Sequence, residues 1–395
     1  MYVAVFGLGA FQETGIKHLK KLNYKIVGFD EFPKPKNKKL VDIFFCVSFK
    51  KRKKILSICK KYNVSCLFAF STDAPLKIIS YINKKLKLSG YKSSNVNLIL
   101  NKIKFRNFLQ NKMKVKLPKF IFLNNFKEQS FVNKKKIDFP IVCKPEIGSG
   151  SRGVFLAENL NDFKRIYSKN KCHYRRKKIL IEKFIPGKEY AIDGWINNNN
   201  FIYGCLSKKQ RTNPPYLLDK NLIINYKNNY LKKKILIFLK KFIKKSTIDN
   251  VPIHLEFILF KEKIVPIDIA IRGAGFGVYS NILNEIMEQS TDLILINLLM
   301  NKKIQFNKPN NKTFYLNFFY SEKSGIFKKL INVNILKKNR SFVKFELYKK
   351  KNSKVSPLKN GSDRIGHFLL MNTPAKLNKD IKHLNRIIKL DIRDE

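Results

Sequence analysis

The sequence predicts a multidomain fold of the α/β and α+β classes, and three observations carry this prediction. In the first 95 residues, short apolar strands alternate with helical segments, which is typical of a parallel sheet with helical crossovers. Near residue 100 this alternation ends, and longer strands with a glycine-rich loop follow. Past residue 303, apolar and polar residues alternate again. A chain of 395 residues is long enough for two or three domains, so we expect three parts.

The N-terminal part is expected to be a small doubly wound sheet. The sequence predicts a strand at 2–6, a helix to residue 22, strands at 24–29, 41–47 and 66–70, and a helix near 50–62. Gly7-Leu-Gly9 follows the first strand and Asp30 ends the second, which is most of a dinucleotide-binding arrangement. Gln12 stands where that arrangement has its third glycine. A tight strand-to-helix turn without a cofactor is therefore the preferred interpretation.

The remaining parts contain fewer, longer elements. We expect a helix at 101–112, strands at 117–122, 179–185, 254–260 and 264–271, a helix from about 281 to 300, and strands beyond 303 such as 341–348. No window holds the roughly 18 uninterrupted apolar residues of a spanning helix, and the N-terminus has no basic segment before its apolar residues. Six cysteines form no C-x-x-C pair, which favours reduced thiols. We therefore expect no membrane association and a cytoplasmic protein.

The net charge of +53 suggests a polyanion as partner, but its distribution argues against specific nucleic-acid binding. Lysine supplies 69 of the 81 basic residues, and the lysines are spread along the chain. A nucleic-acid surface usually gathers its charge and uses arginine, whose planar fork suits phosphate. We interpret the excess as a composition bias on solvated faces, with weak, salt-sensitive adhesion to polyanions as its consequence.

The stretch VCKPEIGSGSRGVFL contains Gly148, Gly150 and Gly153 in a G-x-G-x-x-G spacing. Strand-like residues lie on both sides, so the sequence predicts a hairpin and no helix start to receive a pyrophosphate. A glycine-rich hairpin can fold over a polyphosphate and donate backbone N–H groups, with Lys144 adding a charge. The alternative is an ordinary hairpin loop.

A second predicted hairpin brings two carboxylates together. If Lys261–Lys263 is a three-residue turn, Phe260 faces Ile264 and Glu256 lies opposite Asp268, with Cβ atoms about 5 Å apart. Two carboxylates so placed repel each other unless a cation lies between them. Mg²⁺ (or Mn²⁺) that also binds substrate phosphates is the preferred interpretation, and an exposed acidic pair is the alternative.

Together these segments resemble the ATP-grasp superfamily, most closely its carbamoyl-phosphate-synthetase-like carboxylate–amine ligases. The resemblance rests on the helix from Asn101, on the FPIVCKP strand with the glycine loop, on EKFIPGKE at 182–189, and on HLEF and PIDIAIR. It implies a pre-ATP-grasp domain at 1–98 and an ATP-grasp domain at 99–302, with lobes of about 99–180 and 181–302. It also implies a C-terminal lobe at 303–395.

The resemblance also implies roles for individual residues, with ATP and Mg²⁺ as cofactors. Lys102 and Lys144 would bind the phosphates, under a loop of Gly148, Ser149, Gly150, Ser151 and Gly153. Adenine would lie against Glu182, Lys183, Phe184 and Ile185, and Glu189 would take the ribose hydroxyls. Glu256 and Asp268 would hold the metal. Arg272, which shares the face of Asp268 by period-two counting, would act with Lys144 in catalysis by binding the substrate carboxylate or the acyl phosphate. The Gly273-Ala-Gly275 segment would then let the substrate approach the backbone.

One position departs from the family pattern. Many members have Asn two residues after the second acidic ligand, and here that residue is Ala270. In the predicted pairing His254 lies opposite Ala270. Either His254 or water completes the site, or a second metal is weakly held. For His254 itself, simple packing is the preferred interpretation.

The expected function is an ATP-dependent ligase that activates a carboxylate as an acyl phosphate and couples it to an amine. The resemblance implies small-molecule carboxylate and amine substrates and allows a homodimer. Three alternatives stay open: a non-catalytic Mg-ATP-binding protein, a basic nucleic-acid-binding protein, and a nicotinamide oxidoreductase using Gly7-Leu-Gly9. The last would leave the later motifs without a role.

Overall fold

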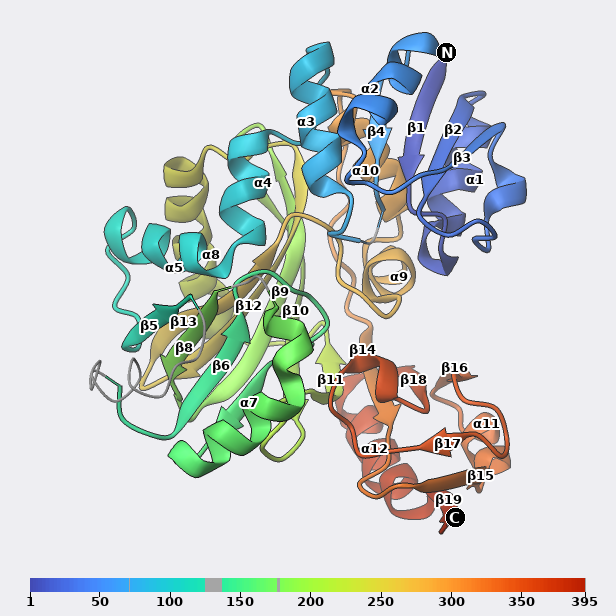
Figure 1. Ribbon diagram of the computed structural model, residues 1–395. Coiled ribbons are helices and arrows are strands. Elements are labelled where there is room, and N and C mark those ends of the chain that lie inside the picture. The colour runs from blue at the N-terminus through green and yellow to red at the C-terminus, as the bar shows by residue number, and fades with distance from the viewer. Residues whose placement is uncertain (71, 125–136, 176–177, 395) are drawn as a thin grey trace.

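The computed structural model describes residues 1–70, 72–124, 137–175 and 178–394, and Figure 1 shows their arrangement. The mixed α/β class expected from the sequence is confirmed. The N-terminal part is a parallel four-stranded sheet with strand order β3-β2-β1-β4. Its elements are β1 (Tyr2–Phe6), α1 (Glu13–Lys21), β2 (Lys25–Asp30), β3 (Ile43–Cys46), α2 (Arg52–Lys61), β4 (Leu67–Phe68) and α3 (Leu76–Leu86).

The turn after β1 is a structural turn of this sheet. Gly7 has a φ of +80°, a left-handed conformation that favours glycine. The Asp30 carboxylate accepts hydrogen bonds from the backbone N–H groups of Leu8 (2.7 Å) and Phe32 (2.9 Å). Asp30 thereby connects the loop after β1 with the loop after β2, and this agrees with the preferred interpretation of Gly7-Leu-Gly9 as a tight turn.

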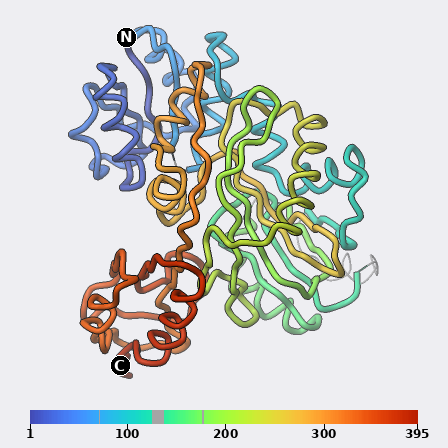
Figure 2. The backbone as a smooth tube through the Cα atoms, turned by 180° about the vertical axis from the view of Figure 1, so that it is seen from behind, coloured from blue at the N-terminus to red at the C-terminus, as the bar shows by residue number. Residues whose placement is uncertain are grey.

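A helix from far along the chain completes the N-terminal core. Helix α10 (Thr291–Leu299), which is expected from the sequence to belong to the second lobe, lies beside β1 and β4 (Figures 1 and 2). Leu295, Ile296 and Leu299 belong to the same buried cluster as the apolar residues of β1. The Thr14 hydroxyl also donates a hydrogen bond to Asp292 at 2.5 Å.

The middle of the chain contributes a small antiparallel sheet with strand order β5-β8-β6-β7. Helix α7 packs on β7 through Phe163, which lies 5.9 Å from Phe155 between ring centroids. These elements and the helices before them are α4 (Ser93–Leu100), α5 (Lys102–Asn111), β5 (Phe120–Leu123), β6 (Ile141–Pro145), β7 (Phe155–Ala157), α7 (Leu160–Tyr174) and β8 (Ile179–Lys183).

An eight-stranded sheet forms the centre of the molecule, with strand order β13-β12-β9-β10-β11-β14-β18-β16. Strands 9 to 13 come from the middle of the chain, and β14, β18 and β16 come from its C-terminal part. The C-terminal part therefore continues the central sheet. The bounds are β9 (Lys188–Asn197), β10 (Asn200–Arg211), β11 (Asp219–Ile224), α8 (Asn229–Ser246), β12 (Val251–Phe260), β13 (Lys263–Ala270), α9 (Leu283–Met287), β14 (Thr313–Phe319), β16 (Phe342–Leu347) and β18 (Gly366–Asn372).

A three-stranded sheet, β17-β15-β19, completes the C-terminal part at the end of the molecule opposite the N-terminal sheet (Figure 1). Its elements and neighbouring helices are β15 (Gly325–Ile331), α11 (Val333–Lys338), β17 (Lys354–Val355), α12 (Pro374–Ile387) and β19 (Lys389–Arg393). Within the described ranges, no helix combines the length and apolar character that crossing a membrane requires. All six cysteines are free, as expected.

Candidate functional site

A cavity of about 1260 Å³ lies where the small sheet, the central sheet and the C-terminal part meet. Its wall includes residues of β6, β8, β10, β12 and β13, with Asp73 from the N-terminal part and Arg364 from the C-terminal part. Ligand pockets are commonly about 300–1,000 Å³, so this cavity has room for a nucleotide and a further molecule.

The glycine loop forms part of this wall, as a hairpin. Strands β6 and β7 pair antiparallel with Cys143 opposite Phe155, so the predicted strand–loop–strand arrangement is confirmed. Gly148, Ser149, Gly150 and Ser151 line the cavity, and Gly150 has a φ of +66° with open space where a Cβ would lie. Gly153 is placed behind the loop. Its φ is +75°, and a Cβ there would meet His173 Cβ at 2.7 Å, so this glycine allows the loop to lie against α7.

Lys144 lies at the centre of a buried ion-pair cluster. Its Nζ is 2.7 Å from Glu182 Oε2, and Arg106 of α5 binds the same carboxylate. Burial alone would raise the pKa of Glu182, but Arg106 and Lys144 outweigh it and lower that pKa to about 2. Burial lowers the pKa of Lys144 in turn, against the attraction of Glu182. The Glu182 side chain is therefore occupied by cations, and only its backbone remains for the expected contact with adenine.

The rest of the expected adenine segment also lines the cavity. Lys183, Phe184 and Ile185 follow Glu182 at the end of β8. The Phe184 N–H donates to the Pro140 carbonyl at 3.0 Å, and Lys183 Nζ donates to the Phe139 carbonyl at 2.6 Å. These bonds fix the segment against the strand that carries Lys144.

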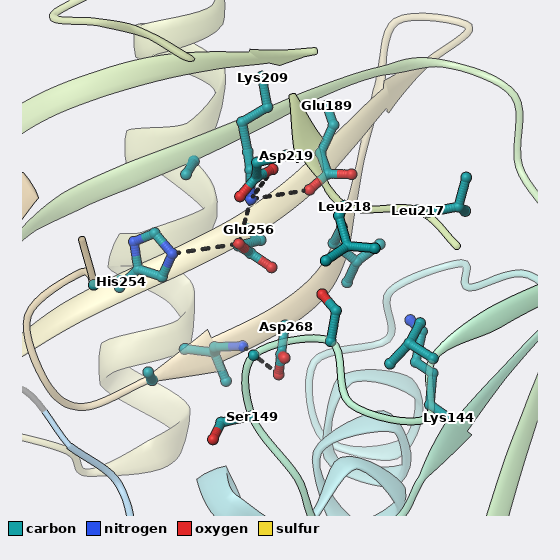
Figure 3. Close-up of a pocket in the computed structure, with 18 of the residues that line it drawn as sticks. Lys144, Ser149, Glu189, Lys209, Leu217, Leu218, Asp219, His254, Glu256 and Asp268 are labelled. Carbon is teal, nitrogen blue, oxygen red and sulfur yellow. Dashed lines mark hydrogen bonds and ion pairs between the residues drawn. The ribbon is translucent and has the colours of Figure 1, made fainter. Parts of the chain in front are cut away.

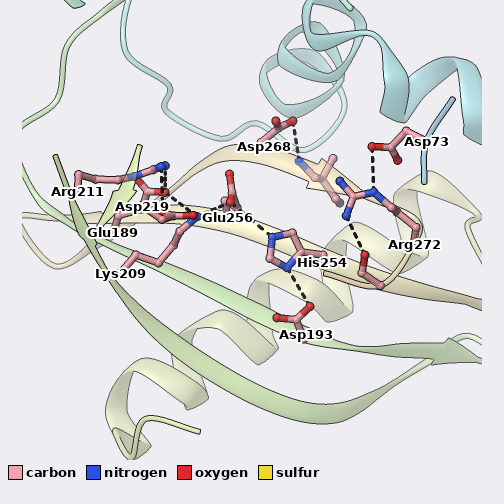
Figure 4. A network of polar contacts seen from close by, with 12 residues as sticks. Asp73, Glu189, Asp193, Lys209, Arg211, Asp219, His254, Glu256, Asp268 and Arg272 are labelled. Carbon is pink, nitrogen blue, oxygen red and sulfur yellow. Dashed lines mark hydrogen bonds and ion pairs between the residues drawn. The ribbon is translucent and has the colours of Figure 1, made fainter. Parts of the chain in front are cut away.

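A second ionic cluster surrounds Glu189 (Figures 3 and 4). Arg211 binds the Glu189 carboxylate through two nitrogens, and Lys209 Nζ lies 3.2 Å from Glu189 Oε1 and 3.2 Å from Asp219 Oδ1. Lys209 also binds Glu256. Burial lowers the pKa of Lys209, but Asp219 and Glu256 outweigh it and raise that pKa above its ordinary value. Sequence reasoning missed Lys209, Arg211 and Asp219, although the two cations stand two residues apart, as on one face of a strand.

The hairpin of β12 and β13 brings the predicted carboxylates together. Glu256 pairs with Asp268 and His254 with Ala270, as expected. The predicted turn is wrong: the loop is Lys261-Glu262, both with positive φ, and Phe260 pairs with Lys263. Such two-residue turns match the twist of antiparallel strands. A bulge between Glu256 and Phe257 then shifts the register by one residue, so the pairing at Glu256 is the same as a three-residue turn would give.

Glu256 and Asp268 both face the cavity (Figure 3), and each has a lysine partner. Lys102 Nζ lies 2.5 Å from Asp268 Oδ2, and Lys209 binds Glu256. In the part of the chain that the structure describes, no three His, Cys, Asp or Glu side chains form a ready metal cage. Two carboxylates nevertheless fit Mg²⁺, because this ion usually fills its remaining coordination positions with waters and phosphate oxygens.

His254 makes specific polar contacts (Figure 4), so simple packing does not describe it. Its Nδ1 lies 2.9 Å from the buried Asp193 Oδ1, and its Nε2 lies 3.5 Å from Glu256 Oε1. Burial opposes the protonated ring, but Asp193 outweighs burial and raises the pKa of His254 to about 10.

Arg272 lines the cavity just after β13 and is held by the N-terminal part. Its Nε lies 2.9 Å from Asp73 Oδ2, and its Nη1 donates to the Gly273 carbonyl at 2.8 Å. Sequence reasoning missed Asp73, because no local pattern connects it with a residue 199 positions later. The position of Gly273 leaves no room for a side chain, since a Cβ would lie 2.0 Å from Tyr279 Cγ.

Comparisons with known proteins match part of this chain to a known family. Residues 137–280 match the family described as ATP-grasp domain. Formate-dependent phosphoribosylglycinamide formyltransferase of Prochlorococcus marinus (strain MIT 9301) is 21% identical over 191 residues, which are 46% of this chain and 47% of that protein. Carbamoyl-phosphate synthase of Methanobrevibacter smithii is 33% identical over 107 residues, 27% of this chain and 26% of that protein. The chain thus spans about half or less of the length of these curated relatives.

The solved structures cover the whole chain. The L-amino acid ligase from Bacillus licheniformis superposes with a TM-score of 0.85 at 16% identity, covering 100% of this chain and 99% of the other. N5-carboxyaminoimidazole ribonucleotide synthetase from Thermotoga maritima gives 0.70 at 16% identity, with 99% of each chain covered. At such identities the likeness establishes the fold.

Proposed function

We propose, from the premise that residues 137–280 form an ATP-grasp domain, that this protein is an ATP-dependent carboxylate–amine ligase. One observation carries the proposal. A glycine-rich hairpin with Lys144 and a facing pair of carboxylates, Glu256 and Asp268, line the same cavity. Phosphoryl transfer from ATP uses this combination of cations, backbone donors and metal ligands.

In the proposed complex, Lys102 and Lys144 bind the phosphates under Gly148, Ser149, Gly150 and Ser151. The 182–185 segment contacts adenine, and Glu189 takes the ribose hydroxyls. Mg²⁺, held by Glu256 and Asp268, would neutralise charge on the phosphoryl group in transfer. His254, which lies opposite Ala270 and near Glu256, would support this pair in place of the Asn that the family resemblance implies.

The two lysines beside the proposed metal-binding carboxylates would have different roles in the nucleotide complex. Lys102 and Lys209 act as counter-ions of the two metal-binding carboxylates. If Glu256 and Asp268 hold Mg²⁺, Lys102 would be free to bind the phosphates. Lys209 retains Glu189 and Asp219 as partners. Lys102 would thus exchange the Asp268 carboxylate for a phosphate, and either anion neutralises its charge.

The proposed reaction has two steps. A substrate carboxylate oxygen attacks the γ-phosphorus of ATP, the bond to ADP breaks, and an acyl phosphate forms. The nitrogen of an amine then attacks the carbonyl carbon, inorganic phosphate leaves, and the amine loses a proton to solvent. Arg272, fixed by Asp73, would orient the carboxylate and stabilise the acyl phosphate.

The test is thermal unfolding with Mg-ATP, with ATP plus EDTA, and without nucleotide. A ligand at about 100 times its Kd adds about 2.7 kcal/mol of stability, so the wild-type midpoint should rise with Mg-ATP and rise less with EDTA. Lys144→Ala should lose this rise. Lys119→Ala, an exposed lysine that does not line the cavity, should keep it. An unchanged rise in Lys144→Ala would refute the phosphate site.

A screen of carboxylate and amine pairs for ADP release then tests the chemistry. Sustained ADP release should need both substrates, because the carboxylate alone supports only the first step. A wild type that shows the Mg-ATP rise but releases no ADP with any pair would favour the non-catalytic alternative.

A further inference from the structure

Arg364 is a buried cation in the cavity wall that the proposed reaction does not use. It follows the turn at Gly361–Asp363, lines the cavity, and is 2% exposed. Its Nη2 donates to the backbone carbonyl of Asp219 at 2.9 Å. Its Nε is buried and, among the described residues, has no hydrogen-bond partner.

Arg364 differs from the other buried cations of this wall in having no carboxylate partner. Lys102, Arg106 and Lys209 each bind an aspartate or glutamate. Within the ranges that the structure describes, no acidic side chain lies at ion-pairing distance from Arg364. Asp219, whose backbone it binds, gives its carboxylate to Lys209 and Arg211 at 3.2 and 3.0 Å.

An unpaired buried cation is costly, because burial removes its hydration without a compensating charge. Burial accordingly lowers the pKa of Arg364, and Asp219 opposes this only in part. An anion that enters the cavity would remove this cost. The nucleotide phosphates already have Lys102, Lys144 and the glycine loop.

Two aromatic rings pack against the Arg364 guanidinium. Its central carbon lies 3.7 Å from the ring centroid of Phe318 and 4.4 Å from that of Phe276, and both rings line the cavity. The two ring centroids lie 4.9 Å apart, so the rings pack on adjacent sides of the guanidinium and do not enclose it. N–H groups that point away from the rings remain for a planar anion. A carboxylate matches those groups in shape and charge.

The position of this group points to a substrate. Phe276 lies four residues beyond Arg272, on the segment that contains the cavity-lining Ala274 and Gly275. Phe276, which packs against Arg364, therefore lies on the same cavity-lining segment as the residue proposed to hold the reacting carboxylate. The apolar side chains of Leu316 and Val278 also line the cavity and favour an apolar substrate body.

We propose that Arg364 binds a substrate carboxylate other than the one that receives the phosphoryl group. This inference rests on the proposed function and specifies its substrate class. The second carboxylate belongs either to the amine, which is then an amino acid, or to the acid, which is then a dicarboxylic acid.

The experiment compares matched substrates in the ADP-release assay with wild type, Arg364→Gln and Arg364→Lys. Amines are supplied as amino acids and as their carboxamides, and acids as dicarboxylates and as their monoamides. The wild type should prefer the free acid in one of these series by about tenfold or more in kcat/KM, mainly through KM. In Arg364→Gln the preference should fall to about twofold or less, and Arg364→Lys should retain part of it. The series in which the preference disappears identifies which substrate carries the carboxylate.

A binding measurement makes the result independent of turnover. With Mg-ADP present, a free acid at millimolar concentration should raise the wild-type unfolding midpoint more than its amide does, and Arg364→Gln should lose this difference. Both variants should keep the Mg-ATP rise, which shows that the fold and nucleotide site are intact.

The proposal is overturned if the acid preference of Arg364→Gln equals that of the wild type. It is also overturned if no acid in the panel is preferred over its amide in either measurement. By contrast, loss of the Mg-ATP rise in the wild type itself would count against the proposed function.

Discussion

Replacing Glu182 by Gln should destabilise the protein by about 3 kcal/mol, because its carboxylate is the buried counter-ion of two cations. Lys144 and Arg106 lower the pKa of Glu182 from an ordinary value of 4.5 to about 2. A pKa difference of this size corresponds to about 3 kcal/mol in favour of the ionised form. Removing one partner of a buried ion pair costs about 3–5 kcal/mol in other proteins, which agrees in magnitude.

Urea unfolding at pH 7 measures this loss, from the transition midpoint and its slope. Glu158→Gln is the matched control, because Glu158 is exposed at the end of β7 and should change stability by no more than about 0.5 kcal/mol. Arg106 and Lys144 would remain buried in Glu182→Gln without their shared carboxylate. A loss below about 1 kcal/mol in this variant would refute the assigned role of the cluster.

Three further predictions follow from the same geometry. Because folding lowers the pKa of Glu182, the contribution of its carboxylate to stability is complete above pH 4.5 and is lost as pH falls through about 2. The difference in unfolding free energy between wild type and Glu182→Gln should therefore be constant from pH 7 to 5 and smaller at pH 3. An unchanged difference at pH 3 would contradict this. Gly153→Ala should lower the unfolding free energy in urea by about 1–3 kcal/mol, because Gly153 has a positive φ and a Cβ there would lie 2.7 Å from His173. Gly148→Ala should lower it little, because its Cβ would meet nothing closer than 4.0 Å. Equal losses in the two variants would refute the assigned difference. Asp268→Asn should remove the extra rise in unfolding midpoint that Mg²⁺ adds to ATP, and a retained rise would exclude Asp268 as a metal ligand.

Local patterns were sufficient to predict the N-terminal strands, the glycine hairpin and the pairing of Glu256 with Asp268 on adjacent strands. Each depends on residues that are close in sequence or joined by a short turn. Even there, the predicted turn of the acidic hairpin was one residue too long, and a bulge compensated for it. Periodicity shows which face a side chain takes, but it does not show where a strand gains an extra residue.

The cations that share the site could not be predicted in the same way. Strands β9 to β11 were not identified, so Lys209, Arg211 and Asp219 had no assigned face. Asp73 and Arg364 reach the cavity from opposite ends of the chain through the packing of the N-terminal and C-terminal parts on the central sheet. Such contacts depend on tertiary structure, and a single sequence contains no local signal for them.

The measurement that tests the ligase proposal most directly follows ¹⁸O from the carboxylate substrate into inorganic phosphate. A substrate pair that supports ADP release is used, with both carboxylate oxygens labelled. An acyl phosphate intermediate predicts one ¹⁸O atom in each phosphate released, because the attacking oxygen stays on phosphorus when the amine displaces it. Phosphate that contains no ¹⁸O would contradict the account, since water and not the carboxylate would then have attacked ATP.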